Sequence, residues 1–166
     1  MGSSRDVVIV GGARTPLVKS GLNFKDVHAA ELGRVAMKEA IARSNINVND
    51  VDEVIIGNAG NPSDAVNISR VVALNSGIPL KVPAFTVHRN CASALESIAS
   101  GFERIKSGSA NLVIAGGTES MSNMPLIFSK KFADWFGKFA SAKTITQKLA
   151  MLTKFNLNYL MPKIAI

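Results

Sequence analysis

The chain contains one cysteine, Cys91, at a position where a thiol can be made reactive. It follows an apolar run, Ala84 to His88, that predicts a β-strand, and it opens a stretch that predicts a helix to about Lys106. A thiol at a helix N-terminus feels the positive end of the helix dipole, which favours the thiolate, and Arg89 adds positive charge nearby. The N–H groups of the first turn can also bind a developing oxyanion. Cys91 is therefore a candidate nucleophile; the alternative is a small buried hydrophobe, as a lone cysteine often is.

A nucleophilic cysteine normally needs a base, and the chain offers two histidines, His28 and His88. His88 lies on or just past the predicted strand, where a buried, hydrogen-bonded histidine is the more ordinary interpretation. A base must also lie within reach of the nucleophile, and nothing in the spacing places either histidine there. One cysteine and two histidines do not make a closed structural metal site, so we expect no metal.

A second cluster of small and polar residues, Gly116 to Ser122, follows another predicted strand. Two successive glycines allow a close approach of the backbone or a positive φ, and the alternative is an ordinary turn. The earlier pair Gly11-Gly12 does not open a Gly-x-Gly-x-x-Gly helix and runs on to Arg14-Thr15-Pro16 instead, which excludes a dinucleotide fingerprint. No Walker A, His-Glu-x-x-His or Gly-x-Ser-x-Gly sequence occurs.

The elements that position these residues alternate between strand and helix. The predicted strands are 6–10, 54–56, 84–88 and 111–115, and the predicted helices are 29–43, 65–76 and 91–106. Asp64 is the expected N-cap of the second helix, and Gly77 its stop. This order predicts an α/β fold with a mostly parallel sheet and helices on both faces. Sites in such sheets lie beyond the carboxyl ends of the strands, which directs attention to four turns: 11–15, 57–64, 88–91 and 116–122.

Composition separates the tail from the rest of the chain. The 166 residues are 47% hydrophobic and 19% charged, which indicates a globular protein with a core. No apolar run is long enough for a transmembrane helix or a signal peptide, so we expect a protein that is not secreted. Residues 1–119 carry 12 Lys and Arg against 11 Asp and Glu, whereas residues 120–166 carry seven Lys against Asp134 alone. The basic tail predicts an anionic partner.

The same tail carries apolar residues at three- and four-residue steps between Ser129 and Phe155. This spacing predicts one or two basic amphipathic helices. Five of the nine Phe and Trp residues lie in this segment. A role in contacting a partner, a ligand or a membrane surface is the alternative to simple packing against the body of the protein.

Three of these segments together resemble the thiolases. Val8 to Pro16 resembles their first strand and turn, Asn90 to Leu95 their nucleophile segment, and Ala115 to Ser122 their glycine-rich segment. The tail, with its motifs 121–125 and 154–162, is similar to the long insertion of 3-ketoacyl-CoA thiolases of the fatty-acid oxidation β-subunit type. The resemblance implies a thiolase N-terminal domain over residues 1–122 and the beginning of a helical lid over residues 123–166.

The resemblance also implies a reaction. The Cys91 thiolate would attack a 3-ketoacyl-CoA, release acetyl-CoA and hold the shortened acyl chain as a thioester that free CoA then accepts. The Cys91 backbone N–H would belong to an oxyanion hole. Met121, Ser122 and the lid, 123–166, are candidates for substrate and CoA contacts. Coenzyme A would be a co-substrate, and no bound cofactor is expected.

The resemblance covers only the first of two similar thiolase halves. The family's base, a histidine, and its second catalytic cysteine belong to the second half, so we expect these 166 residues to be inactive without it. The resemblance further implies a homodimer or larger assembly, a 3-hydroxyacyl-CoA-processing partner subunit, and membrane contact through the basic lid. The expected compartment is the cytoplasm in a bacterium and the mitochondrion in a eukaryote.

Three other functions remain as alternatives. Within the fold, the chain can be a related cysteine-dependent condensing enzyme, although the Gly116 to Ser122 segment and the basic lid favour a thiolase. It can also be a non-catalytic thiolase-like protein that binds lipid or a membrane, against which the retained Cys91 argues. Nucleic-acid binding is disfavoured because the basic tail contains no recognisable reading module.

Overall fold

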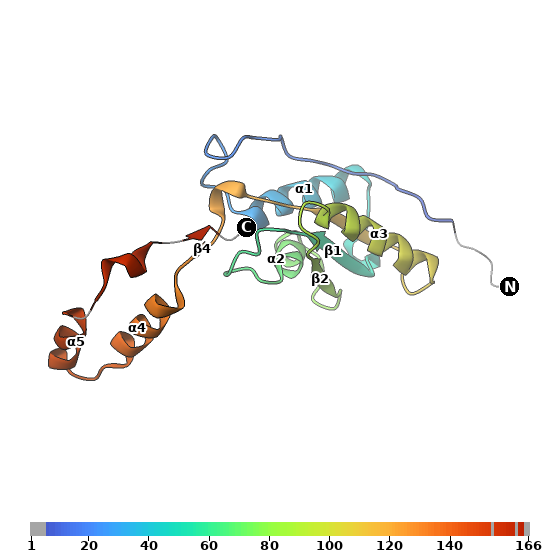
Figure 1. The fold of residues 1–166 in the computed structure, drawn as a ribbon. Helices are drawn as coiled ribbons and strands as arrows, with labels where there is room; N and C mark the ends of the chain where they lie inside the picture. Colours follow the sequence, from blue (N-terminus) through green and yellow to red (C-terminus); the bar gives the residue numbers. More distant parts are fainter. Residues whose placement is uncertain (1–5, 154, 162, 165–166) are drawn as a thin grey trace. The chain divides into compact units, whose positions relative to one another are not determined.

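The computed structural model describes residues 6–153, 155–161, 163 and 164, so Lys154 and Pro162 of the tail motif lie outside the described residues. The chain forms two compact units, Met1–Met124 and Pro125–Ile166 (Figure 1). Each unit has its own secondary structure and is described by itself.

The first unit is built on a three-stranded parallel sheet. Its strands are β1, Glu53–Gly57; β2, Ala84–Val87; and β3, Val113–Gly117. Their order is β2-β1-β3, with Ile55 of β1 opposite Phe85 and Ala115. β1 lies in the centre because its Val-Ile-Ile run is apolar on both faces, as a strand covered from both sides must be.

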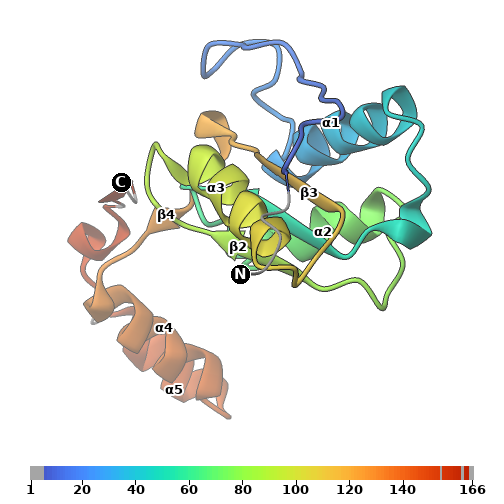
Figure 2. The same ribbon diagram turned by 90° about the vertical axis from the view of Figure 1, so that its right-hand side faces the viewer.

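Three helices cover the two faces of this sheet. They are α1, Ala29–Arg43; α2, Ile68–Asn75; and α3, Ser93–Lys106. Val54 and Ile56 point into a core shared with α1 and α2, whereas Gly101 of α3 lies over Val113 and Ala115 on the opposite face. Figure 2 shows α3 in front of the sheet and α2 behind it. The predicted α/β architecture, with a parallel sheet between two helical layers, is therefore confirmed.

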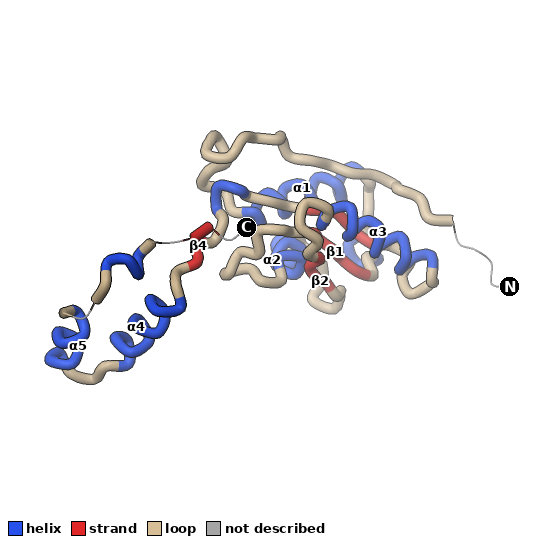
Figure 3. The backbone as a smooth tube through the Cα atoms, viewed as in Figure 1, coloured by secondary structure: helices blue, strands red, loops and turns tan. Residues whose placement is uncertain are grey.

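The second unit is mostly helical (Figure 3). It contains α4, Lys130–Ser141, and α5, Ile145–Leu152, which confirm the predicted amphipathic helices. Trp135 lies at the centre of an aromatic cluster, with ring centroids 4.4 Å from Phe155 and 5.2 Å from Phe139. Its other elements are short: β4, Leu126–Ile127, pairs with β5, Lys163–Ile164, and η3, Leu157–Leu160, is a 3-10 helix. The first unit contains two further 3-10 helices, η1, Val48–Asp50, and η2, Met121–Asn123.

The predicted first strand, Asp6 to Val10, is wrong. These residues form an extended loop in which Val8, Ile9 and Val10 are 70%, 86% and 64% exposed. A strand exists only where a neighbouring backbone accepts and donates its hydrogen bonds, and none of the described strands pairs with this segment. The apolar, β-branched sequence signals a strand but does not say whether a partner edge is present.

Three predicted boundaries also move. Asp64 does not cap α2; Asn67 does, because its side-chain oxygen accepts from the Arg70 N–H and its amide group binds the Ala84 carbonyl of β2. α3 begins two residues after Cys91, because a turn precedes it. β3 begins two residues later than predicted, because the Asn111 and Leu112 N–H groups bind the Asp52 carboxylate instead.

No helix in the described part of the chain is long and apolar enough to span a membrane.

Candidate active site

Cys91 is exposed and lies on a tight turn between β2 and α3. The Ala92 N–H donates to the Arg89 carbonyl over 3.0 Å, so Asn90 and Cys91 occupy the two central positions of the turn. Asn90 has a φ of +48°, a left-handed conformation that asparagine tolerates better than most residues. Cys91 is therefore exposed on this turn, which contradicts the alternative of a buried cysteine.

The N-terminus of α3 lies directly on the carboxyl ends of two strands. A Cβ on Gly57, the last residue of β1, would lie 2.2 Å from the Ser93 carbonyl carbon. A Cβ on Gly117, the last residue of β3, would lie 2.5 Å from the Ala94 Cβ. Both glycines are thus required by close approach, and they bring the Cys91 turn to the carboxyl edge of the sheet.

The start of α3 has no capping side chain, although the N–H of its first residue, Ser93, donates to the Asn90 carbonyl over 3.1 Å. The N-cap of α3 is Ala92, which has no side-chain oxygen and makes no capping hydrogen bond. The N–H groups of a first helical turn have no partner within the helix, so an uncapped start can bind an anion or an oxyanion. Arg89 forms an ion pair with Glu96 one turn into the helix, so its charge is partly neutralised rather than directed only at the thiol.

A cleft of about 640 Å³ opens at this edge of the sheet. Most of its wall comes from four parts of the first unit: residues 13–20, 57–59, 90–91 with 93–94, and 117–122. Phe24, Leu32 and Ala36 complete the lining. The structure therefore brings together parts of all four turns that the sequence singled out, with the 11–15 turn contributing from residue 13 onward. Cys91 lies in the wall of this cleft, where a substrate can reach it.

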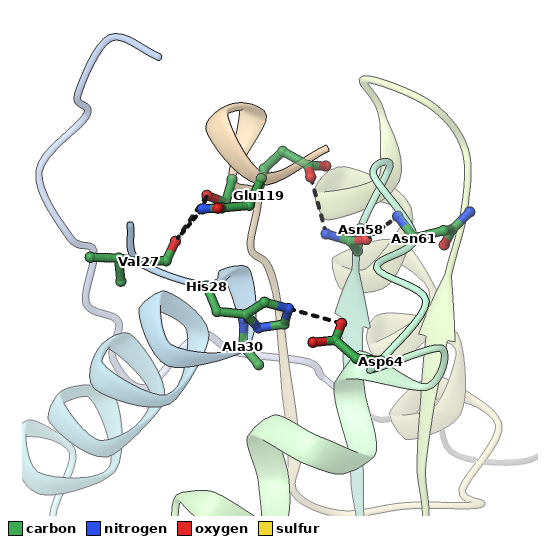
Figure 4. Close-up of polar contacts among 9 residues, drawn as sticks. Val27, His28, Ala30, Asn58, Asn61, Asp64 and Glu119 are labelled. Atoms are coloured by element: carbon green, nitrogen blue, oxygen red, sulfur yellow. Dashed lines mark hydrogen bonds and ion pairs between the residues drawn. The ribbon is translucent and has the colours of Figure 1, made fainter. Parts of the chain in front are cut away.

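A network of hydrogen bonds around the buried Asn58 amide joins two of the segments that line the cleft (Figure 4). Asn58, only 1% exposed, follows β1; its amide donates to the Thr118 carbonyl over 2.7 Å and its oxygen accepts from the Asn61 N–H over 2.7 Å. The Glu119 carboxylate accepts from the Ala59 and Gly60 N–H groups over 2.8 and 3.1 Å. The loops that follow β1 and β3 are thereby fixed to each other.

The two histidines hold structural positions. His28 caps α1: its Nδ1 accepts from the Ala30 N–H over 3.1 Å, which leaves Nε2 to donate to the Asp64 carboxylate over 3.2 Å (Figure 4). His88 is hydrogen-bonded as expected, with Nδ1 3.1 Å from the Asn58 carbonyl and 3.0 Å from the Asn61 amide, but it is exposed rather than buried. Neither arrangement supplies a base hydrogen-bonded to Cys91.

The two candidate binding residues in the first unit, Met121 and Ser122, both line the cleft. Met121 is 61% exposed, so its thioether can contact a ligand. Ser122 also has a structural role, because its Oγ accepts a hydrogen bond from the Gly21 N–H over 2.9 Å and so connects a turn distant in the sequence to the cleft. Among the described residues, no three His, Cys, Asp or Glu side chains gather as a metal site would require.

Sequence reasoning missed Asn58 and Glu119 as organisers of the cleft. Asn58 sits directly after a buried apolar strand, and Glu119 follows two glycines; both positions were inside turns that the sequence marked for attention. The hydrogen bond between them joins residues 61 positions apart, so no local sequence pattern predicts it.

The fold, with an exposed cysteine on the turn between β2 and α3, defines a thiolase-type domain. The family profile described as "Thiolase, N-terminal domain" matches residues 7–162. The chain therefore belongs to the thiolase family.

Individual relatives agree with this assignment. The chain is 35% identical over 156 residues to a 3-ketoacyl-CoA thiolase of Pseudoalteromonas translucida, an alignment that covers 94% of this chain and 36% of the relative. It is 34% identical over 160 residues to the mitochondrial trifunctional enzyme subunit beta of Bos taurus, covering 96% of this chain and 34% of the relative. A thiolase structure from Ascaris suum in complex with coenzyme A superposes with a TM-score of 0.74 at 33% identity, over 76% of this chain and 33% of that one.

The chain thus spans about a third of the length of these relatives. Both curated relatives are named as enzymes or enzyme subunits, one by its acyl-CoA substrate class.

Proposed function

We propose that this chain carries the nucleophile of a 3-ketoacyl-CoA thiolase and that Cys91 is that nucleophile. The observation that carries the proposal is the exposed Cys91 thiol in the wall of the cleft, on a turn that leads into an uncapped helix. A thiolate needs access to an electrophilic carbon, and the resulting oxyanion needs N–H donors close by. The turn and the first turn of α3 offer both.

The chemistry proceeds in two acyl transfers. The Cys91 sulfur attacks the 3-keto carbon, and the bond between carbons 2 and 3 then breaks; its electron pair leaves with the acetyl-CoA enolate, which takes up a proton. The shortened acyl group remains on Cys91 as a thioester. The thiol of free CoA, after giving its proton to a base, attacks that thioester and returns Cys91 as the thiolate. The acid and the base for these proton transfers are expected from the second half of the thiolase fold.

Coenzyme A is the proposed co-substrate, with Met121 and Ser122 contributing to the cleft that receives the acyl group. The second unit is the proposed lid segment for the acyl-CoA. Its helices carry Lys130, Lys131, Lys138 and Lys148, and the link between them carries Lys143. Residues 120–166 contain a single acidic residue, Asp134. Such a surface favours the phosphates of CoA, and charge reversal at Lys138 and Lys143 is expected to raise KM for acyl-CoA while leaving kcat unchanged.

The proposed assembly with other subunits follows from the chain's similarity to its relatives. One relative is named as a subunit of a trifunctional enzyme, which supports a homodimer or larger assembly with a 3-hydroxyacyl-CoA-processing partner. Contact of the basic lid with a membrane belongs to the same proposal. Mass photometry of the purified protein, alone and with anionic vesicles, measures each of these associations.

The decisive experiment is mass spectrometry of a polypeptide that joins this chain to a second thiolase half, after incubation with acetoacetyl-CoA, because the acid and the base are expected from that half. Trypsin cleaves after Arg89 and Arg104, so the peptide 90–104 contains Cys91 and no other cysteine. We expect this peptide to gain one acetyl group and Cys91→Ala to gain none. An unmodified Cys91 in a protein that cleaves 3-ketoacyl-CoA, or no modification and no cleavage, contradicts the proposal.

A further inference from the structure

A buried hydroxyl group is hydrogen-bonded to the Cys91 turn. Ser93 is the first residue of α3 and is 4% exposed. Its Oγ accepts from the Arg89 N–H over 2.8 Å and donates to the Asn90 carbonyl over 2.7 Å. The two bonds connect Ser93 to Arg89 and Asn90, the two residues that directly precede Cys91.

This is not the usual role of a serine at a helix start. A capping serine accepts from an N–H group two or three residues ahead of it, inside the helix. Ser93 instead reaches backward, out of the helix, to the N-terminal arm of the turn. The hydroxyl group therefore stabilises the turn rather than the helix.

The turn needs such support because Asn90 has a positive φ, which costs energy in any residue other than glycine. Two backbone hydrogen bonds also span the turn, from the Ala92 N–H to the Arg89 carbonyl over 3.0 Å and from the Ser93 N–H to the Asn90 carbonyl over 3.1 Å. The side-chain ion pair between Arg89 and Glu96 adds little, because the arginine side chain is 69% exposed. The main chain of Ser93 packs closely against Gly57 at the end of β1. The chain of contacts thus runs from the rigid sheet through Ser93 to the turn.

We propose that Ser93 is a positioning residue for the nucleophile: its hydroxyl group, bonded to Arg89 and Asn90, fixes the turn that aligns the Cys91 thiol with the first-turn N–H groups of α3. The inference rests on the proposed function of Cys91. Misalignment of a reacting atom by about 1 Å can cost on the order of 100-fold in rate, so loss of the hydroxyl is expected to slow acyl transfer without burying or removing the thiol.

The test compares two buried serines on the same helix. Ser93→Ala removes the turn contacts. Ser97→Ala is the matched control, because Ser97 is also buried and its Oγ lies 2.7 Å from the Ala94 carbonyl and 2.6 Å from the Gly116 carbonyl, away from the turn. Both substitutions remove one buried hydroxyl group, so a general loss of stability affects both.

Two readouts follow each variant. The first is NMR: a residue with positive φ gives a strong NOE between its own amide and α protons, and we expect this signal at Asn90 to weaken in Ser93→Ala and to persist in Ser97→Ala. The second is the rate at which acetoacetyl-CoA acylates Cys91, expected to fall roughly 10- to 100-fold in Ser93→Ala alone. Alkylation by iodoacetamide, which needs only an accessible thiol, is expected to change less than about 3-fold.

A retained Asn90 signal in Ser93→Ala, or acylation equal to that of Ser97→Ala, overturns the positioning role. If the unaltered protein is not acylated at all, the proposed function fails, and the Asn90 signal alone then decides whether Ser93 fixes the turn. Hydrogen exchange in the unaltered protein provides a test that does not depend on whether Ser93→Ala folds. The Arg89 amide, bonded to Ser93 Oγ, must exchange slowly with solvent, and free exchange there contradicts the inference.

Discussion

Gly57 and Ser93 are separated by 36 positions in the sequence, yet a Cβ added to Gly57 would stand 2.2 Å from the Ser93 carbonyl carbon. This contact is between backbones, so no side-chain rotation can relieve a clash there. It joins the central strand, β1, to α3, the helix that follows the Cys91 turn. The position of Cys91 relative to the sheet therefore depends on the absence of a side chain at Gly57.

Gly57→Ala is expected to displace the start of α3 and to lower the free energy of unfolding by about 3 kcal/mol, as overpacking of a rigid site does. Urea denaturation measures the stability, and the acylation of Cys91 measures the displacement. Gly116→Ala is the matched control: it lies in β3, has no atom within 4 Å of its would-be Cβ, and is expected to change stability by less than about 0.5 kcal/mol. Equal stabilities of the two variants would contradict the close approach.

Asn58 is the second residue on which the cleft depends. Removing its side chain in Asn58→Ala leaves the Thr118 carbonyl and the Asn61 N–H without their partner, and a buried unpaired group costs about 1–3 kcal/mol. We expect a loss of about 3 kcal/mol in unfolding free energy by urea titration. Asn75→Ala, at an exposed position at the end of α2, should remain within about 0.5 kcal/mol of the unaltered protein. Similar losses at both positions would mean that the Asn58 network adds no stability.

These residues also mark the limit of prediction from sequence. The strands around Ile55 and Phe85, the helix 29–43 and the position of Cys91 near a helix start follow from local patterns, because apolar periodicity and turn residues act over a few positions. The gathering of four turns at one edge follows from parallel topology. The segments that form the cleft could therefore be predicted from the sequence, although their contacts could not.

What failed depends on partners far away in the chain. The segment 6–10 has the composition of a strand but no described strand beside it. Asp64 resembles a helix cap, yet its carboxylate binds His28, 36 residues earlier. Asn58 and Glu119 meet across 61 residues. Local sequence carries no information on these pairings, and the untested roles of Cys91 and of residues 123–166 as nucleophile and lid remain predictions.

Asp52 makes stability depend on pH. Its carboxylate accepts from the Asn111 and Leu112 N–H groups over 2.6 and 3.1 Å, and these hydrogen bonds hold its pKa below the ordinary value of 3.8. A lowered pKa in the folded state stabilises the protein above the unfolded value, and the contribution is lost as the pH falls through the folded value. Asp52→Asn is expected to lose about 1 kcal/mol at pH 7, a modest value because the group is exposed.

The difference between Asp52→Asn and the unaltered protein should shrink as the pH falls below about 4, where the aspartate begins to be protonated in the unfolded chain. Urea denaturation at a series of pH values measures it. Asp50→Asn provides the control, since Asp50 is exposed on the adjacent 3-10 helix and makes no described side-chain contact with residues 111 and 112. A stability difference at Asp52 that stays constant across the acid range would contradict the assigned hydrogen bonds.

The second unit has its own reporter, because Trp135 is the only tryptophan in the chain. Its indole N–H donates to the Met151 carbonyl over 3.2 Å, and its ring lies 4.4 Å from that of Phe155. Phe155→Ala removes the closest aromatic partner, so we expect a red-shifted Trp135 emission and a loss of about 2 kcal/mol in the fluorescence-detected transition. Leu157→Ala, at a residue 74% exposed, should leave both unchanged. An unshifted spectrum in Phe155→Ala would show that the α4–α5 segment does not hold its cluster in solution, and the lid proposal would lose its structural basis.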